Sequence, residues 1–320
     1  GRIGKIARRV ERWIDLARTP NSEKKIVIML HNNPCGSVEG TVGSATHLDA
    51  LDSAADILKR LESEGYRVVA PSGGKELIDA IMDRKAVSEF RWTTVDEIVA
   101  KGGVLAMIDE SQYREWFDEL PGRTRARMID AWGNPPGEEK DGMPAGMVYG
   151  GKMLVTGVRF GNAIVCVQPK RGCVGARCDG QVCKILHDPD VPPPHQYLAS
   201  YWWFSRVFGA HAIIHVGTHG NMEFLPGKAV GLSDGCMPDI AIDAMPNLYI
   251  YNADNPPEGT IAKRRGLATL VDHMQTVMVE GELYGVMQEL EQLIDQYDRY
   301  ASSEPGKAHT ISHMIKARAG

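Results

Sequence analysis

The sequence predicts an α/β protein made of Rossmann-like parallel-sheet domains with flanking helices. Short apolar runs at 25–30 and 212–214 are typical of buried strands, and each leads into a loop that contains Gly. Segments whose apolar residues recur at helical spacing lie between such runs. Strands that alternate with helices favour parallel pairing with right-handed crossovers.

Length and composition set the outer limits of the interpretation. A chain of 320 residues suggests two domains, which we expect at 1–145 and 146–320, because residues 133–151 are dense in Gly and Pro. A net charge of −5 favours neither nucleic acid nor an anionic membrane as partner, and no apolar run approaches the length of a membrane span. Six cysteines without a secretory signal favour a reducing cytoplasm. The start Gly1-Arg2-Ile3-Gly4 indicates a fragment of a longer chain.

The first part of the chain predicts a helix and then a βαβ unit. Apolar spacing predicts an amphipathic helix over 3–18. The run 25–30 predicts a buried strand, which is followed by a helix over 48–64 and a second strand over 66–70. Four short helices then follow, together with one apolar run at 104–108 that fits either a strand or a helix; the helices are at 75–83, 94–101, 111–119 and 123–131.

The second part of the chain continues the alternation of strands and helices. Two strands at 152–158 and 163–168 are expected to form a hairpin. A helix over 195–208 follows three prolines and leads into a strand at 211–216. The remaining expectations are a helix start at 236–239, a strand at 248–251, a loop at 252–260, an acidic amphipathic helix at 283–300 and a poorly ordered polar tail from 301.

The stretch 215–228 reads H-V-G-T-H-G-N-M-E-F-L-P-G-K and carries three proton-accepting groups. It continues an expected strand, and ligands of open α/β sheets bind beyond the carboxyl ends of strands. The imidazoles of His215 and His219 and the carboxylate of Glu223 suit metal binding or proton transfer. The alternative is a turn whose histidines bond backbone groups.

Three cysteines form a second cluster in the sequence. Cys173, Cys178 and Cys183 have the spacing C-x4-C-x4-C, which is no standard zinc pattern and supplies only three thiolates. An iron–sulfur cluster or a zinc ion would need a fourth ligand from elsewhere in the chain. The alternative is that these are free loop cysteines.

Several common catalytic motifs are missing from the sequence. It contains no G-x4-G-K-[ST], no H-E-x-x-H and no G-x-S-x-G, and no G-x-G-x-x-G follows a strand. Direct use of ATP and ordinary hydrolase chemistry both lose support.

A set of motifs in fixed order resembles a known family. They are R-F-G-N at 159–162 leading to V-Q-P at 167–169, H-D-P-D at 187–190, P-P-H at 193–195, F-G-A-H-A at 208–212, the stretch 215–228, V-G-L-S at 230–233, N-P-P-E-G-T at 255–260 and A-K-R-R at 262–265. Together they resemble the large subunit of the cobaltochelatases, the CobN type, and the related large subunit of magnesium chelatase. The resemblance is close over 150–275 and looser at the start of the chain.

The resemblance implies a subunit that binds a tetrapyrrole and an incoming divalent metal, while separate AAA+ ATPase subunits use ATP to drive insertion. It implies a role in metal insertion for Glu223, and metal binding or proton relay for His215 and His219. Four further residues are candidate substrate-binding groups: Lys228, His195, Arg264 and Arg265.

The resemblance implies that the metal is either Co²⁺ or Mg²⁺. Imidazole suits cobalt whereas magnesium prefers oxygen ligands, which favours cobalt and a corrin precursor over magnesium and a porphyrin. The C-x4-C-x4-C segment at 173–183 departs from the pattern of the chelatase family that the chain resembles.

Two alternatives from other classes stay open. One is a zinc-dependent hydrolase that uses His215, His219 and Glu223 at i, i+4 and i+8, although Gly217 and Gly220 argue against a helix there. The other is a non-catalytic tetrapyrrole-binding or iron–sulfur module.

Overall fold

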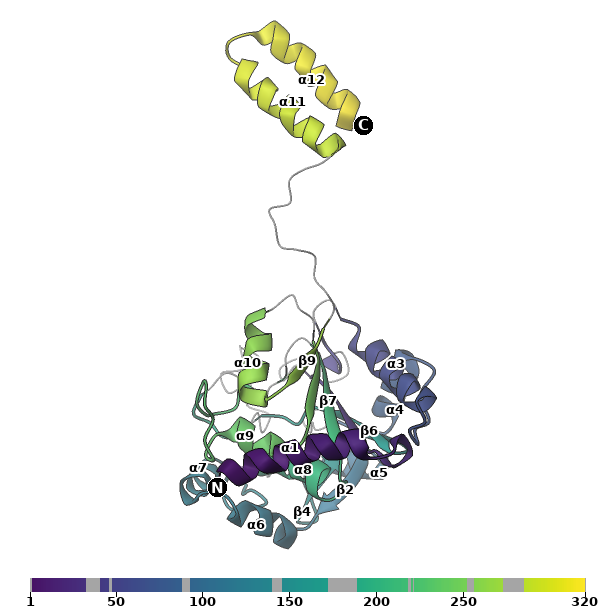
Figure 1. Ribbon diagram of the computed structural model, residues 1–320, viewed down its shortest axis with the longest axis vertical. Coiled ribbons are helices and arrows are strands. Elements are labelled where there is room, and N and C mark those ends of the chain that lie inside the picture. The colour runs from purple at the N-terminus through teal and green to yellow at the C-terminus, as the bar shows by residue number, and fades with distance from the viewer. Residues whose placement is uncertain are drawn as a thin grey trace. The chain divides into compact units, whose positions relative to one another are not determined.

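The computed structural model of the chain describes residues 2–32, 41–45, 48–87, 93–139, 146–171, 189–217, 220, 222–251, 256–272 and 285–319. The chain forms two compact units, Gly1–His273 and Met274–Gly320. The first unit has sheets covered by helices, and the described part of the second is a pair of helices (Figure 1).

The first unit is built on a six-stranded sheet in the order β5-β6-β1-β7-β8-β9. Five of its strands pair in parallel, and only β5 at one edge is antiparallel to its neighbour β6. This arrangement confirms the predicted α/β class. The strands are β1 (Ile26–Leu30), β5 (Val158–Phe160), β6 (Ala163–Val167), β7 (Ala212–Gly217), β8 (Asn247–Tyr251) and β9 (Thr269–Val271).

A second, smaller sheet has the order β2-β4-β3 and is antiparallel. Its strands are β2 (Val104–Ile108), β3 (Val148–Tyr149) and β4 (Lys152–Thr156). The apolar run at 104–108 is therefore a strand. The strand expected at 152–158 is divided at Gly157, because β4 lies in this sheet and β5 lies in the large one.

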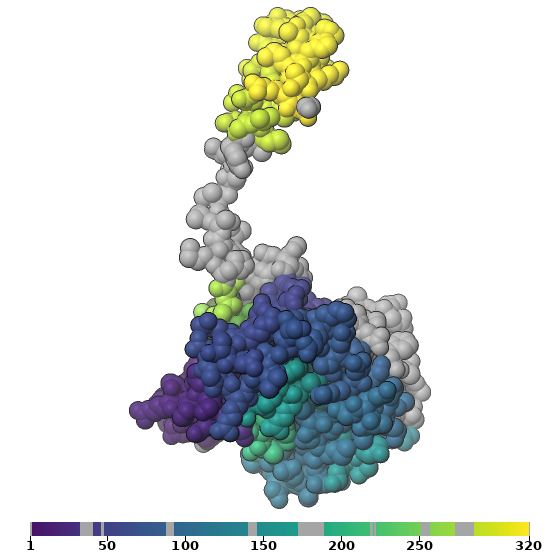
Figure 2. Space-filling model, turned by 90° about the vertical axis from the view of Figure 1, so that its right-hand side faces the viewer, coloured from purple at the N-terminus to yellow at the C-terminus, as the bar shows by residue number. Residues whose placement is uncertain are grey.

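Alternation along β1 explains why helices cover both faces of the large sheet. Ile26, Ile28 and Leu30 pack into one core with residues of α3 (Ala50–Ser63) and α4 (Gly74–Asp83). Val27 and Met29 point to the other face and join the aromatic core around α8 (His195–Arg206). Successive strand residues point to opposite faces, so five consecutive apolar residues serve two cores. Figure 2 shows the side of the unit on which α3 and α4 form the surface.

The other described helices of the first unit follow the sequence expectations, except that α10 begins at Pro256, inside the loop expected at 252–260. They are α1 (Arg2–Arg18), α5 (Val95–Ala100), α6 (Glu110–Asp118), α7 (Gly122–Trp132), α9 (Met237–Ile242) and α10 (Pro256–Gly266), with a short 3-10 turn η1 (Asn21–Glu23). The described part of the second unit contains α11 (Val286–Tyr300) and α12 (Pro305–Ala319). No helix among the described residues is both long and apolar enough to cross a membrane.

Three expectations are corrected by the structure. The division at residues 145/146 does not hold, because β1 pairs with β6 and β7, which lie beyond that boundary, within a single compact unit. Residues 66–70 form no strand, so β1 takes its parallel neighbours from much later in the chain. The polar tail expected from 301 is mainly helical, since α12 packs on α11 through Ala308 and Ile311.

Helix α1 is attached to α9 by ion pairs with a buried carboxylate. Lys5 Nζ lies 2.9 Å from Asp239 Oδ2, and Arg9 donates to Asp239 Oδ1 at 2.7 Å. Burial alone would raise the pKa of Asp239, but the hydrogen bonds and charges of Arg9 and Lys5 more than offset it and hold that pKa below its usual value. The stabilisation is therefore present above the unfolded-state pKa and is lost as pH falls through the lower folded-state value.

We expect Asp239→Asn to lower the free energy of unfolding at neutral pH by about 1–3 kcal/mol, less than for a fully buried pair because Lys5 and Arg9 are partly exposed. The difference from wild type should shrink as the pH falls from about 4, where the carboxyl group of the unfolded chain becomes protonated, through the lower pKa of Asp239 in the folded state. Urea unfolding at neutral pH and at a pH below about 4 measures the free energy of unfolding of both proteins. Asp56→Asn, which breaks an exposed pair with Lys59, is the control and should change stability little. Equal effects of the two substitutions would contradict the prediction.

Candidate functional site

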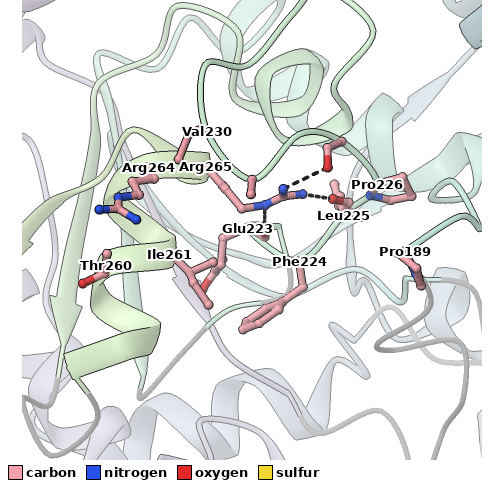
Figure 3. A pocket seen from close by; sticks show the side chains of 12 residues that line it. Pro189, Glu223, Phe224, Leu225, Pro226, Val230, Thr260, Ile261, Arg264 and Arg265 are labelled. Atoms are coloured by element: carbon pink, nitrogen blue, oxygen red, sulfur yellow. Dashed lines mark hydrogen bonds between the residues drawn. The ribbon is translucent and has the colours of Figure 1, made fainter.

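A cavity of about 360 Å³ opens beside the turn that follows β7 (Figure 3). Its walls come from the turn at 223–230 and from one side of α10, with Pro189 at the edge. The lining residues are Pro189, Glu223, Phe224, Leu225, Pro226, Gly227, Ala229, Val230, Thr260, Ile261, Arg264 and Arg265. The volume falls within the range of small-molecule sites, and the lining combines apolar side chains with a few charged groups.

Glu223 is the acidic group of this cavity. Only 2% of the residue is exposed, although it belongs to the cavity wall. Its Oε1 accepts a hydrogen bond of 2.8 Å from the Gly220 N–H, so the carboxylate is held in one orientation by its own loop. A fixed and largely desolvated carboxylate is well suited to accept a proton from a bound molecule.

Arg265 holds the backbone of the same turn from α10. Its Nε donates to the Glu223 carbonyl at 2.6 Å, and one terminal nitrogen donates to the Gly227 carbonyl at 3.0 Å. It also donates to the carbonyls of Leu225 and Lys228. Burial lowers the pKa of the Arg265 guanidinium, and the nearby negative charge of Glu223 opposes that shift. Figure 3 shows the guanidinium directed into the turn, so its main contacts are with protein carbonyls.

Cys236 supports the turn from its other side. Its Sγ accepts hydrogen bonds from the backbone N–H groups of Lys228 and Ser233, at 3.3 Å and 3.2 Å. Burial would raise the pKa of the Cys236 thiol, but these bonds and the Ser233 hydroxyl lower it overall. The sequence placed Cys236 only at the start of a predicted helix, and nothing in its spacing indicated this contact.

His215 lies on β7 inside a buried hydrogen-bond network. Its Nδ1 is 2.8 Å from Asn247 Oδ1, and its Nε2 is 3.1 Å from the Tyr201 hydroxyl. The Asn247 amide nitrogen donates to the Gly266 carbonyl, so its oxygen faces His215 and takes the Nδ1 proton. Burial lowers the pKa of His215 to about 4, and the ring is neutral at physiological pH. The expected role of His215 as a metal ligand is corrected, because both ring nitrogens already have protein partners.

The network continues away from His215 through two tyrosines of α8 and through Gln168, which follows β6. The Tyr201 hydroxyl lies 3.1 Å from Gln168 Oε1 as well as from His215 Nε2, and its single proton can serve either acceptor. Gln168 Nε2 donates to the Tyr197 hydroxyl at 3.1 Å. Tyr197 and Tyr201 are one helical turn apart on α8, which is the one signal that could have paired them. Negative charge at Glu223 contributes to raising the pKa of both tyrosines, after burial as the main cause. The network therefore lies within electrostatic reach of the cavity.

His195 is placed in the core and away from the cavity. Its Nδ1 is 3.0 Å from the Tyr113 hydroxyl and its Nε2 is 3.0 Å from the Gly133 carbonyl. Burial lowers the pKa of His195 to about 4. The expectation that His195 binds substrate is corrected, since the ring joins α8 to α6 and to the end of α7.

The other candidate residues divide into exposed and undescribed ones. Arg264 lines the cavity and is exposed, and Lys228 is exposed at the end of the turn. His219, Cys173, Cys178 and Cys183 lie outside the described residues. Within the described ranges, no three His, Cys, Asp or Glu side chains are grouped so that they could hold a metal ion.

The zinc-hydrolase alternative loses its geometric basis. It required His215, His219 and Glu223 on one face of a helix. His215 lies on strand β7 and Glu223 lies in the turn beyond it. The i, i+4, i+8 spacing therefore does not correspond to one face of a helix.

Gly220 offers a direct test of how tightly Glu223 is held. A Cβ at residue 220 would lie 3.0 Å from Glu223 Oε2 and 3.2 Å from the Tyr249 hydroxyl. We expect Gly220→Ala to displace the carboxylate and to reduce whatever chemistry Glu223 supports by about tenfold or more, since small misplacements of catalytic groups are costly. Gly122→Ala is a control for the added methyl group away from the cavity, because a Cβ there would meet nothing within 4 Å and the residue has no positive φ. Steady-state kinetics of both variants would measure the effect, and unchanged kinetics in Gly220→Ala would contradict the argument.

Comparison with known proteins places these features in context. A family model described as CobN/Magnesium Chelatase matches residues 1–320. An uncharacterized protein of Methanocaldococcus jannaschii is 53% identical over 319 residues, which cover 98% of this chain and 25% of that protein. The aerobic cobaltochelatase subunit CobN of Pseudomonas aeruginosa is 35% identical over 98% of this chain and 24% of that protein. A magnesium-chelatase subunit of Chlorobaculum parvum is 31% identical over 99% of this chain and 23% of that protein.

A solved structure agrees with these relatives. The catalytic subunit of cobaltochelatase from Mycobacterium tuberculosis superposes with a TM-score of 0.67 at 32% identity, over 98% of this chain and 25% of that one. The chain thus spans about a quarter of the length of the proteins it matches.

Proposed function

Because this chain belongs to the CobN/magnesium chelatase family, we propose that it is the part of a chelatase subunit in which Glu223 assists insertion of a divalent metal ion into a tetrapyrrole. The observation that carries this proposal is a buried carboxylate on the wall of an open cavity, fixed by the Gly220 N–H at 2.8 Å. The activity is a proposal for the whole subunit, since the chain spans about a quarter of its relatives.

The chemistry of insertion needs a proton acceptor near the ring. A free macrocycle must lose protons from its ring nitrogens as the metal enters, and the metal must lose bound water. Glu223 accepts such a proton or holds the incoming, partly hydrated metal substrate from a position that is itself largely buried. His215, neutral and bonded to Asn247 and Tyr201, acts at most as part of the network behind the site.

The ring itself suits the apolar and cationic parts of the cavity. Phe224 and Ile261 supply apolar surface for its flat face, and Arg264 supplies an exposed cation for its acidic side chains. We keep Lys228 in the same role, because it is exposed at the end of the turn. Arg265 has a different role from the one expected: it positions the turn, and its contact with substrate is secondary.

We propose cobalt as the metal and a corrin precursor as the ring. Identity to the cobaltochelatase of P. aeruginosa, 35%, exceeds identity to the magnesium chelatase of C. parvum, 31%. The preference of cobalt for imidazole now rests on His219 alone, because both nitrogens of His215 are engaged. The choice of metal is therefore the part of the proposal that experiment must decide first.

We assign ATP hydrolysis to separate AAA+ ATPase subunits, since the sequence contains no P-loop motif. Six cysteines in a chain of this size fit a reducing compartment such as the cytoplasm. A thiolate-bound zinc or iron–sulfur site at Cys173, Cys178 and Cys183 stays a proposal of the sequence alone.

The test is a metal-insertion assay on the purified protein with its AAA+ partner subunits and ATP, followed by the visible absorbance of the ring. One arm supplies a metal-free corrin precursor with Co²⁺, and the other supplies a metal-free porphyrin with Mg²⁺. ATP-dependent insertion in the cobalt arm alone supports the full proposal. Insertion in the magnesium arm alone would overturn the choice of metal, and binding of neither ring would overturn the proposed function.

A further inference from the structure

Two histidines face each other on the helical hairpin of the second unit. Helix α12 packs on α11 with Ala308 and Ile311 buried, which leaves His309 and His313 exposed on another side of the helix. Their Nε2 atoms are 3.2 Å apart. The ring centroids are 4.7 Å apart and the ring planes are nearly perpendicular, at 88°.

This geometry matches two imidazoles that share one metal ion. Residues at i and i+4 are neighbours on a helix surface, so the spacing brings the two rings together without distortion. Imidazole nitrogens bind zinc-like ions at about 2.0–2.1 Å, so two nitrogens on one ion lie about 2.8–3.4 Å apart at octahedral or tetrahedral angles. The observed separation of 3.2 Å falls inside that interval.

We propose that His309 and His313 form an exchangeable binding site for a divalent transition-metal ion. Imidazole favours Co²⁺, Ni²⁺, Cu²⁺ and Zn²⁺, whereas Mg²⁺ prefers oxygen ligands. The described residues place no third His, Cys, Asp or Glu beside the pair. Two protein ligands leave the other positions to water, unlike the four protein ligands of a structural zinc site. Such a site binds moderately and releases its ion readily.

The alternative explanation of the same contact is a hydrogen bond between two neutral imidazoles, one donating and one accepting. It would bring the rings equally close but would give the protein no metal affinity at this helix. An experiment that measures metal binding therefore distinguishes the two explanations. The proposal is independent of the Glu223 cavity, because metal binding here requires neither tetrapyrrole nor ATP.

The experiment titrates the purified, metal-free protein with Co²⁺ while the backbone amide resonances of α12 are followed by NMR, and calorimetry gives the affinity. We expect Co²⁺ to perturb the resonances around His309 and His313, and Mg²⁺ to leave them unchanged. In His309→Gln and in His313→Gln, the affinity of this site should fall by about tenfold or more, since changes that only touch the surroundings of a ligand already cost about 10- to 100-fold.

The matched control is the double variant His313→Gln/Met314→His. It keeps two histidines in the helix but places them five residues apart, so they no longer share a face. Met314 is half exposed, and the change should not disturb packing. Loss of the Co²⁺ effect in this variant supports the proposal. An unchanged effect in it or in the single variants, or none in wild type, would overturn the site, and an equal response to Mg²⁺ would overturn the metal class.

Discussion

Replacing Glu223 by Gln should slow metal insertion by about 10²- to 10⁴-fold, the usual contribution of a positioned acid or base. The amide keeps the size of the side chain and can still accept the Gly220 hydrogen bond, which is 2.8 Å long in wild type. It cannot accept a ring proton and carries no charge to attract the metal. Binding of the metal-free ring should therefore stay within about twofold of wild type, because the shape of the cavity is unchanged.

The measurement is the insertion rate with partner subunits and ATP, together with the dissociation constant of the ring from absorbance titration. Glu223→Asp is the informative companion, because it keeps the charge but withdraws the carboxylate by one methylene. We expect it to retain more activity than Glu223→Gln. A Glu223→Gln protein that inserts metal at the wild-type rate would exclude a chemical role for this carboxylate.

Replacing Arg265 by Met should lower kcat for insertion by about 10- to 100-fold, with a smaller effect on KM. The guanidinium donates to the carbonyls of Glu223 and Gly227 and to two others in the same turn. A hydrogen bond from a charged donor contributes about 1.5–3 kcal/mol, so losing the set should loosen the backbone that carries Glu223. Arg265→Lys should recover only part of the rate, since an ammonium group cannot reproduce the planar fork of the guanidinium.

Arg264→Met is the matched control for Arg265→Met. Arg264 directly precedes Arg265 on α10 and lines the same cavity, but it is exposed. If Arg265 positions the turn, its loss should speed hydrogen exchange at residues 222–228 and affect kcat, whereas loss of Arg264 should raise KM with little change in exchange. The same effect of both substitutions on KM, with no change in exchange, would mean that Arg265 binds the ring directly.

Local patterns in the sequence predicted much of the fold. The run 25–30 predicted β1, and the unbroken apolar character of residues 26–30 follows from burial on both faces. The apolar spacing of residues 3–18 predicted α1 within one residue at its start. Residues 66–70 were assigned to a strand incorrectly, because a short apolar segment satisfies a strand pattern whether or not a partner strand lies beside it.

The larger errors in the predicted fold come from contacts between residues far apart in the chain. The division at 145/146 followed a Gly- and Pro-rich segment, but strand order is set by contacts between residues far apart in the chain, as between Ile28 and Val165. Composition near a boundary carries no information about such pairs. The polar tail from 301 lacked a strong apolar face, yet Ala308 and Ile311 give α12 enough buried surface to pack on α11.

At the site, too, the sequence predicted which residue types matter but not the surroundings of each side chain. The sequence predicted Glu223 as a site residue in the loop beyond a strand, and in the structure it lies in the cavity wall. It could not show that His215 is engaged by Tyr201 and Asn247, which are 14 and 32 residues away. Arg265 was expected to face substrate because of its charge, although its partners are carbonyls about 40 residues earlier.

The most direct test of the account is whether the metal-free ring binds in the cavity that contains Glu223. Val230 lines this cavity and is 58% exposed, while Val69 lies outside its lining and is 73% exposed, so Val→Trp at each site adds the same bulk to an exposed position. Absorbance titration with a metal-free corrin precursor should show binding at least about tenfold weaker in Val230→Trp, through steric exclusion from the pocket, and unchanged in Val69→Trp. Equal affinity of the wild-type protein and both variants would place the ring elsewhere and contradict the central claim.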